Sequence, residues 1–480
     1  MTSASATLSA PTGRSGTPAA DRPGLGLLVL LLATFMTALD IFIVNVAIPA
    51  VQGDLHAGTA AVQWVVAGFG LAVATGLITA GRLGDIFGRR RMFTIGLALF
   101  TVTSAACGFA PTAGTLVAAR VLQGLSAALM GPQVLSILQT GYTGKAQARA
   151  FGMYGLTMGV GAVFGQLIGG LLIKADVLGL GWRACFLINL PVGLLALVLV
   201  PRALRESRAP RRPRLDNTGV ALSSAAVVAL VLPLIQGRAL GWPLWTWLCL
   251  AGSAVLSAVF VAHQSRRGAA GGDPVLDTEL FRQRGFSLSA LCQLVFWTGQ
   301  GSFFLILALY LQAGRGLDAL GSGVVFLSIG GGYLLTSTTA HRLAVRLGSR
   351  TVPAGALLMA AGLGLLWVAV HRSGTGGSLW ELVPGLFLDG VGMGMVIAPL
   401  THDALAAVPP RLVGSASGVV ATIQQISGAL GIALIGIVFY RAVGDGSPDR
   451  YPHAFGLGLG FLLALELALA ALSAATAKSR

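Results

Sequence analysis

Long apolar runs separated by short polar segments dominate the chain. An α-helix rises 1.5 Å per residue, so about twenty apolar residues cross the ~30 Å hydrocarbon core of a bilayer. Fourteen runs fit this length and predict an all-α integral membrane protein. Their approximate ranges are 25–49, 61–80, 92–110, 113–140, 150–173, 184–203, 217–237, 243–263, 285–312, 321–345, 352–371, 379–401, 411–440 and 454–476.

Composition agrees with this pattern, because 55% of the 480 residues are hydrophobic and only 10% are charged. The net charge of +15 could indicate nucleic acid, but the basic residues cluster between apolar runs, where they set membrane topology. With the N-terminus inside, 24 of the 32 Lys and Arg residues fall in inner segments and seven in outer ones. We therefore expect a multi-pass protein of the inner (plasma) membrane with both termini in the cytoplasm, and no nucleic-acid partner.

The four cysteines lie within or at the edges of apolar runs, without a CxxC pair or histidine partners. They predict inert buried thiols and no metal site. Residues 1–23 are rich in small and polar residues, which is typical of a disordered tail.

An internal repeat divides the chain. "TAGRLGDIFGRR" at 79–90 aligns with "TAHRLAVRLGSR" at 339–350, and "QGLSAALMGP" at 123–132 aligns more weakly with "DGVGMGMVIAP" at 389–399. These matches place the second span over the tenth and the fourth over the twelfth. The predicted domains are a cytoplasmic tail (1–23), an N-terminal six-helix bundle (24–203), cytoplasmic linkers with an inserted helix pair at about 217–263 (204–284), and a C-terminal six-helix bundle (285–477).

Motifs of ATP-driven motors and soluble hydrolases are missing from the sequence, which contains no GxxxxGK[ST], HExxH or GxSxG. This favours a secondary transporter over an enzyme. A membrane enzyme and a non-transporting sensor remain the alternatives of another class.

Four motifs carry a family resemblance that covers nearly the whole chain. They are "GRLGDIFGRRRMF" (81–93), "LDIFIVNVAIP" (39–49), "RVLQGLSAA" (120–128) and "WRACFLINLPVG" (182–193). In this order and spacing they resemble the major facilitator superfamily, and specifically its fourteen-helix drug:proton antiporter branch. The resemblance implies a major facilitator fold of two six-helix bundles plus two extra helices. It also implies proton-coupled efflux of a small-molecule drug or antibiotic, powered by the proton gradient without a cofactor.

The fifth span departs from the branch pattern, because Gln166 stands where the branch has a proline within GxxxGPxxGG. Gly161, Gly165 and Gly169 still form a stripe that permits close helix packing. We expect transport to be retained, while a facilitator or proton symporter of another small solute stays open as the alternative function.

Charged residues inside apolar helices are costly and usually functional. Asp40 lies within the first span, where a carboxyl can hold a proton or face a cationic substrate, or else form a structural contact, for example with Asn45. Arg120 and Gln123 lie one helical turn apart in the fourth span. The resemblance implicates Arg120 in proton transfer, and we expect it to have a carboxylate or carbonyl partner.

Two acids lie in the second half. Asp389 occupies the repeat position of Gln123, which predicts contact with substrate or proton in a central cavity; the alternative is a solvated carboxylate near the outer face. Glu466 lies in the middle of the last span and is a candidate for proton coupling or for a protonated structural role. The substrate cavity is predicted to contain Asp40, Asn45, Gln123 and Asp389.

The segment 81–93 is predicted to form a cytoplasmic gate. Gly81, Gly84 and Gly88 would permit a tight crossing between the second and third spans. Asp85 and Arg89, four residues apart, can pair if the turn is helical, with Arg90 beside them. The resemblance implies that Asp85 also meets a facing helix end and latches the inner side shut.

Besides the drug, we expect the partners of the protein to be protons and the lipid bilayer. We also expect the protein to be a monomer.

Overall fold

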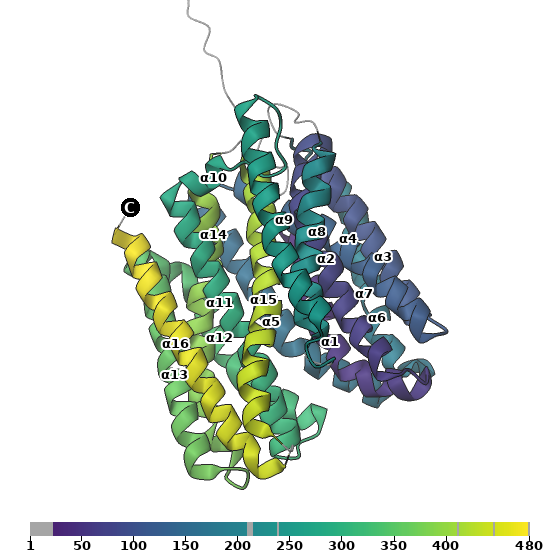
Figure 1. The fold of residues 1–480 in the computed structure, drawn as a ribbon, viewed down its shortest axis with the longest axis vertical. Coiled ribbons are helices and arrows are strands. Elements are labelled where there is room, and N and C mark those ends of the chain that lie inside the picture. The colour runs from purple at the N-terminus through teal and green to yellow at the C-terminus, as the bar shows by residue number, and fades with distance from the viewer. Residues whose placement is uncertain (1–22, 209–214, 238–239, 410–411, 445–446, 479–480) are drawn as a thin grey trace, which may run out of the picture.

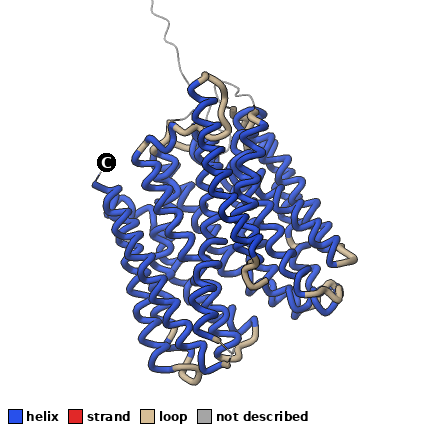
Figure 2. Tube along the Cα trace, viewed as in Figure 1, coloured by secondary structure: helices blue, strands red, loops and turns tan. Residues whose placement is uncertain are grey.

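The computed structural model describes residues 23–208, 215–237, 240–409, 412–444 and 447–478. These described parts contain helices and connecting loops but no strand, as the tube in Figure 2 shows. The prediction of an all-α membrane protein is confirmed.

The N-terminal part of the chain forms seven helices. They are α1 Pro23–Asp54, α2 Thr59–Phe87, α3 Arg89–Gly108, α4 Ala113–Gly141, α5 Gly144–Ala175, α6 Ala184–Leu187 and α7 Asn189–Ala203.

The remaining helices include a pair in the middle and a second large group. The pair is α8 Asn217–Gln236 and α9 Leu244–Ala269; the group is α10 Glu279–Arg282, α11 Arg284–Leu309, α12 Ala319–Leu347, α13 Thr351–Ser373, α14 Val383–Ala406, α15 Val413–Val443 and α16 Tyr451–Lys478.

Among the described residues, twelve helical segments are long and apolar enough to cross a membrane. Two more spans, in α2 and α5, pass the same test when their bent halves are joined, which brings the total to fourteen. Several helices continue beyond the apolar run that predicted them: α1 reaches Asp54 and α9 reaches Ala269. Hydropathy marks only the part of a helix that lies in hydrocarbon, so these polar extensions were not predicted.

Figure 1 shows two groups of helices with the inserted pair between them. The purple and blue helices α1–α4, α6 and α7 form one side, and the green and yellow helices α11–α16 form the other. Helix α5 runs at the centre behind α15, where it packs on α1, α12 and α14. Helix α8 packs on α9 and also contacts α2 and α15, one helix from each group. The inserted pair therefore covers the seam between α2 and α15.

Local sequence explains where several helices begin and end. Gly88 has a φ of 109°, a conformation that favours glycine, and it separates α2 from α3. Thr112 and Thr115 form a reciprocal capping box at the start of α4, and the Asp216 side chain accepts from the Gly219 N–H at the start of α8. These side chains satisfy backbone donors that have no partner within the helix.

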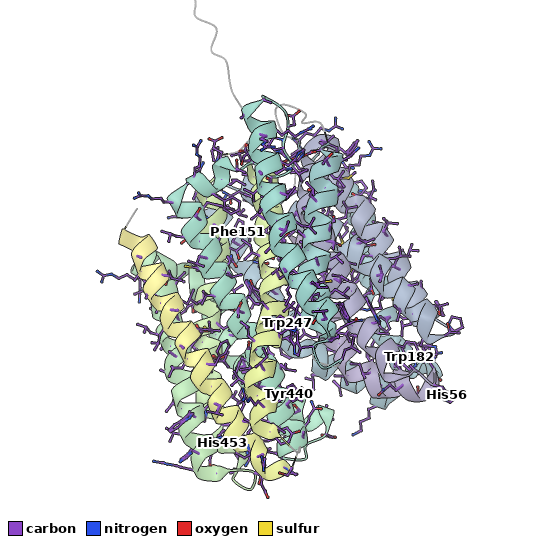
Figure 3. All side chains as sticks on the ribbon, in the orientation of Figure 1. His56, Phe151, Trp182, Trp247, Tyr440 and His453 are labelled. Carbon is purple, nitrogen blue, oxygen red and sulfur yellow. The ribbon has the colours of Figure 1, made fainter. Side chains whose placement is uncertain are left out.

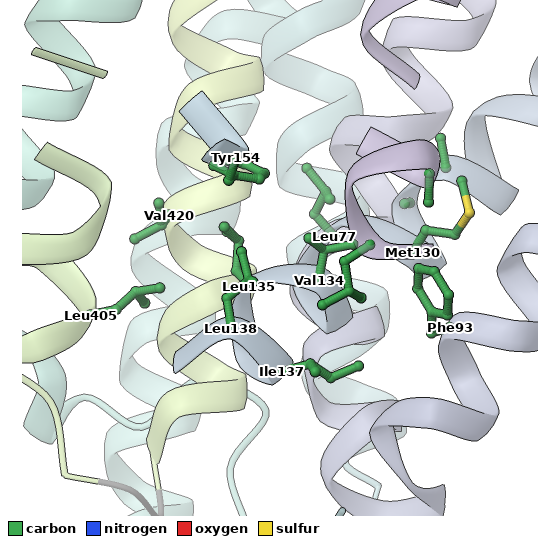
Figure 4. Close-up of a cluster of buried hydrophobic side chains, with 14 of the residues drawn as sticks. Leu77, Phe93, Met130, Val134, Leu135, Ile137, Leu138, Tyr154, Leu405 and Val420 are labelled. Atoms are coloured by element: carbon green, nitrogen blue, oxygen red, sulfur yellow. The ribbon is translucent and has the colours of Figure 1, made fainter. Parts of the chain in front are cut away.

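A hydrophobic core joins the two groups at the end of the bundle that carries Gly88, which we call the basic end. Leu135 and Leu138 of α4 belong to the same buried cluster as Leu405 of α14 and Val420 of α15 (Figure 4). Polar contacts reinforce this closure, since Ser136 Oγ lies 3.2 Å from Ser417 Oγ and Gln139 donates to the Leu405 carbonyl at 3.3 Å. The two halves are therefore closed against one another at the basic end.

Candidate functional site

The Asp40 carboxylate of α1 forms an ion pair with the Arg120 guanidinium of α4. Both side chains are enclosed by protein, with exposed fractions of 0% and 1%. Arg120 also donates from Nε to the Val65 carbonyl of α2 at 3.0 Å, so it has both a carboxylate and a carbonyl partner. A buried charge pair is tolerated when such additional hydrogen bonds satisfy the remaining donors.

Gln123 ties this pair together from the next turn of α4. Its Oε1 accepts from Arg120 at 2.8 Å, and its Nε2 donates to Asp40 Oδ1 at 2.9 Å and to Ser104 Oγ of α3 at 3.2 Å. The structure thus brings together three predicted residues that lie on two helices.

Asn189, the first residue of α7, completes the network and was not singled out by the sequence. Its Nδ2 donates to Ser104 Oγ at 3.0 Å and to Asp40 Oδ1 at 3.4 Å, and the side chain is fully buried. The signal was present, because Asn189 is a lone amide within the apolar motif at 182–193. We call Asp40, Ser104, Arg120, Gln123 and Asn189 the N-half polar node.

Aromatic rings cover the arginine of this node. The Arg120 guanidinium lies 4.2 Å from the centre of the Phe69 ring and 5.7 Å from that of Phe186. A cation over a ring face gains electrostatic stabilisation while water is kept away.

Three of the four predicted substrate residues are enclosed by protein in this conformation and line no open cavity. Asp40 and Gln123 are 0% exposed, and Asp389 is 1% exposed. Asn45 lies on α1 with Asp40, but its side chain falls outside the described residues. Any contact of these side chains with substrate requires the helices around them to move.

Asp389 and Glu466 lie inside the C-terminal half, on α14 and α16. Glu466 is 2% exposed, and the alternative of a solvated Asp389 is wrong because this side chain is buried. Within the described residues, Asp389 Oδ2 and Glu466 Oε2 have no hydrogen-bond partner. In the described part of this half, the two acids therefore have no paired cation, unlike Asp40 in the N-half polar node.

Asp85 lies at the contact between the two halves. Its carboxylate accepts from Arg89 Nη2 at 3.1 Å, and Arg89 Nη1 donates to Thr140 Oγ1 of α4 at 3.0 Å. The carboxylate lies directly against Gly414, the second residue of α15, where a side chain would collide with it. Among the described residues Asp85 Oδ2 has no hydrogen-bond partner, so the dipole of α15 acts on this carboxylate without a bond from the N–H groups at the start of that helix.

Glu206, from the segment after α7, holds the start of α3 beside this contact. Its two carboxylate oxygens accept from the backbone N–H groups of Arg90 and Arg91, each at 3.1 Å. Gly88 lies against the same carboxylate, where a side chain would collide. Arg90 therefore contributes its backbone N–H to this region. The sequence did not reveal Glu206 because it lies 116 residues after Arg90.

Gly81 and Gly84 do not have the role that the sequence predicted for them. A side chain at Gly81 would come within 2.5 Å of the Gly414 carbonyl of α15, and one at Gly84 would collide with Gln133 of α4. Gly81 permits the close approach of α15, and Gly84 permits that of α4. Of the three glycines, only Gly88 lies at the junction between α2 and α3. Sequence spacing places glycines on a helix face but does not show which neighbour the face meets.

Arg82 joins the gate to the segment after the inserted pair. Its guanidinium donates to the Pro274 carbonyl and, at 3.1 Å, to the Val275 carbonyl. Ser415 of α15 also donates to the Val275 carbonyl, at 3.4 Å, and the Leu276 N–H donates to Gln264 of α9 at 3.1 Å. Residues 274–276, which we call the strap, thus contact α2, α9 and α15.

The glycine stripe of α5 faces α1. A side chain at Gly161 would lie 2.5 Å from Ala38 Cβ, one at Gly165 2.9 Å from Phe42 Cβ, and one at Gly169 2.7 Å from Ile43 Cγ1. Helix α5 bends by 46° between Gly144–Ala162 and Leu167–Ala175. Helix α5 is therefore bent even though Gln166 replaces the proline of the branch pattern. The Gln166 side chain falls outside the described residues.

The opposite end of the N-terminal half carries Trp182 and His56, as Figure 3 shows. Here Asp54 accepts from Trp182 Nε1 at 3.0 Å and from Arg183 Nη1 at 2.6 Å, and these bonds lower the pKa of Asp54. The Asp54 bonds therefore tie the last residue of α1 to the turn that precedes α6.

Among the described residues, no group of three His, Cys, Asp or Glu side chains could hold a metal ion.

Fourteen spans, two helix groups closed at one end and a buried charge network define a polytopic membrane transport protein. The sequence profile of the Major Facilitator Superfamily matches residues 30–432. The chain belongs to this family, which confirms the resemblance drawn from its motifs.

Relatives cover most of this chain. It is 39% identical over 438 residues to a "Probable actinorhodin transporter" of Streptomyces coelicolor, covering 90% of this chain and 75% of the relative. It is 36% identical over 452 residues to a "Tetracenomycin C resistance and export protein" of Streptomyces glaucescens, covering 92% and 81%. A solved proton:xylose symporter of the same superfamily shares the fold at a TM-score of 0.63 and 14% identity, covering 92% of this chain and 94% of the symporter.

Proposed function

We propose that the protein exports lipophilic, often cationic, drugs or antibiotics in exchange for protons. The observation that carries this proposal is the Asp40–Arg120 pair, an ionisable group and its counter-ion enclosed within a membrane domain. The relatives support the substrate class, because their names describe antibiotic transport, export and resistance. Membership of a transporter family favours this function over a membrane enzyme or a sensor.

Coupling follows from competition for one carboxyl. A proton on Asp40 neutralises it and removes the charge that holds Arg120, which keeps the Val65 carbonyl and Gln123 as partners. A drug cation near Asp40 would compete with that proton. The binding of either one then excludes the other, which is the condition for antiport.

Helix α2 offers a physical link between this site and the gate. Val65, which accepts from Arg120, and Asp85, which lies against α15, belong to the same helix. A change in the Arg120 contacts can therefore shift the helix that closes the basic end. Alternating access would follow, with the halves moving around the site.

We assign the basic end to the cytoplasm of the plasma membrane, with both termini inside, since Lys and Arg concentrate in the segments on that side. Closure at the basic end then corresponds to a state closed to the cytoplasm. Proton entry from outside supplies about 2.3 kcal/mol per charge for each 100 mV of potential.

Inverted membrane vesicles test the proposal. Vesicles that hold an internal acid pH should release protons when ethidium, a lipophilic cation, or puromycin is added, and should accumulate either compound. Asp40→Asn should abolish both signals, while Asp54→Asn at the opposite end should preserve them. Uptake of drug together with protons would instead indicate a symporter, and the absence of drug movement from wild-type vesicles would refute export.

A further inference from the structure

A groove at the periphery of the C-terminal half lies between α12 and α13. Helix α12 packs on α5 and α14, and α13 packs on α14 and α16, while α12 and α13 make only slight contact with each other. The space between them has a volume of about 630 Å³, within the range of small-molecule sites. Leu357 of α13, which lines this space, is 53% exposed, so the groove opens at the surface of the bundle.

The walls of the groove are apolar along most of their length. Leu343 of α12, Leu357 of α13 and Met395 of α14 represent its three sides. Thr336 also lines the groove, but its hydroxyl already donates to the Val391 carbonyl of α14 at 2.9 Å. A polar group buried without a partner is costly, so the groove suits a ligand whose body is apolar.

The length of the groove matches one leaflet of a bilayer. Thr336 and Arg346 both line it and lie ten residues apart on α12 (346 minus 336), which separates them by about 15 Å along the helix axis. This is half of the ~30 Å hydrocarbon core. Gly355, near the start of α13, lies against Val396 in the part of α14 that leads to Leu405, so Arg346 marks the basic end. The groove therefore runs from that membrane surface to the middle of the bilayer, the depth that a lipid acyl chain occupies.

A single basic side chain lies where the groove meets the membrane surface. Among the described residues that line the groove, Arg346 is the only charged one. It lies in the last turn of α12, is exposed, and has no hydrogen-bond or ion-pair partner in the described part of the chain. An arginine at this depth can lay its apolar stem along the wall while its guanidinium reaches the headgroups. The planar fork of N–H donors matches the oxygens of a phosphate.

The internal repeat shows that this charge belongs to the second half alone. The two copies of the gate segment align Arg346 with Ile86 and Val345 with Asp85. The first copy therefore has an acid among its arginines, and this acid forms an ion pair within the segment. The second copy has lost the acid and gained an arginine. Its positive charge favours an anionic partner from outside the chain.

We propose that the groove binds an anionic phospholipid, with one acyl chain between α12 and α13 and the phosphate held by Arg346. The chain fills the space that these two helices leave above α14, and the headgroup neutralises the arginine at the basic end. Basic pockets between membrane helices bind anionic headgroups in this way. A zwitterionic lipid fits the same walls but carries a positive charge that Arg346 repels.

Photo-crosslinking in lipid nanodiscs tests the proposal. The whole protein is placed in phosphatidylcholine nanodiscs with a small fraction of a probe lipid, either phosphatidylglycerol or phosphatidylcholine, that carries a diazirine on one acyl chain. Mass spectrometry then locates the labelled residues. The phosphatidylglycerol probe should label the groove around Leu343 and Leu357 severalfold more than the phosphatidylcholine probe, and unlabelled phosphatidylglycerol should compete with it.

Three variants separate the headgroup from the chain. Arg346→Ala should reduce labelling by the phosphatidylglycerol probe to the level of the phosphatidylcholine probe. Ala354→Leu enlarges a side chain that lines the groove and should reduce labelling by both probes. Arg372→Ala removes the same charge from an exposed position at the other end of α13 and should change neither signal.

Three results would overturn the proposal. Equal labelling of the wild-type groove by the two probes would show ordinary boundary lipid, and unchanged labelling of Arg346→Ala would remove the arginine from the site. Displacement of the label by ethidium but not by unlabelled phosphatidylglycerol would show that the groove takes a drug. The measurement requires no transport, so its outcome does not depend on the proposed export function.

Discussion

The Asp40 carboxylate and the Arg120 guanidinium form an ion pair that links α1 to α4 with no access to solvent. Removing one member of a buried pair leaves the other charge uncompensated, which typically costs about 3–5 kcal/mol. We therefore expect Arg120→Ala to lower the free energy of unfolding by about that amount. Thermal or denaturant unfolding in detergent measures the loss.

A second substitution separates stability from transport at this pair. Asp40→Asn removes the orphaned charge, so the Arg120→Ala, Asp40→Asn double variant should regain part of the lost stability. It should still fail to couple drug efflux to protons, because no titratable carboxyl remains. Normal proton-coupled efflux by the double variant would reduce the pair to a structural contact.

At the basic end, Asp85→Asn should loosen the closure. The amide keeps the shape of the side chain but removes the charge that favours the start of α15 and pairs with Arg89. A thiol reagent can report the opening at Ser417→Cys, a buried position on the α4–α15 contact, with Cys249 replaced by Ser. We expect severalfold faster labelling and unchanged drug affinity; weaker drug binding with unchanged labelling would contradict the latch.

The spans and the candidate site residues could be predicted from the sequence for identifiable physical reasons, and the family could be predicted from its motifs. Membrane burial requires continuous apolar runs, and an ionisable residue inside such a run is conspicuous, so Asp40, Arg120 and Glu466 could be found directly. The environments of these three side chains could not be predicted from the sequence. The pairing of Asp40 with Arg120 joins residues 80 positions apart, and no local pattern specifies which helices meet.

Residues that act through their backbone or as neutral amides were also hidden from sequence reasoning. Asn189 is a single uncharged side chain, and the strap contributes carbonyl groups that any sequence has. Gly81 illustrates the same limit, because its periodicity is visible while its contact with Gly414 depends on the tertiary arrangement.

Helix packing at the glycine stripe provides a stability test with an internal control. Gly161→Ala introduces a methyl group 2.5 Å from Ala38 Cβ, so α1 and α5 must separate. Overpacking of this kind costs about 1–3 kcal/mol. Gly152→Ala adds the same methyl on the same helix where nothing lies within 4 Å, and it should leave stability unchanged or raise it through helix propensity. Equal melting temperatures for the two variants would show that the stripe does not hold α1.

Asp216 predicts a pH dependence of stability at the inserted pair. Burial opposes its ionisation, but the Gly219 N–H, Gln264, His263 and the nearby Arg267 charge together lower its pKa below the usual 3.8. A lowered carboxyl pKa stabilises the folded state above the unfolded pKa, and this contribution is lost as the pH falls through the folded value. Wild-type protein should therefore lose more stability than Asp216→Asn between pH 6 and about pH 3. Parallel unfolding profiles for the two proteins would contradict the assignment.

Arg82 makes the strap part of the gate, because its guanidinium binds two strap carbonyls while Ser415 of α15 binds one of them. Hydrogen bonds to a charged group contribute about 1.5–3 kcal/mol each, so Arg82→Ala should free the strap from α2. We expect faster hydrogen exchange at the Leu276 amide and faster labelling of Ser417→Cys, with drug affinity retained. Arg91→Ala removes the same charge from an exposed position in the same motif and should change neither rate. If both variants accelerate exchange equally, the effect comes from the net charge of this end, and the strap has no role in closing it.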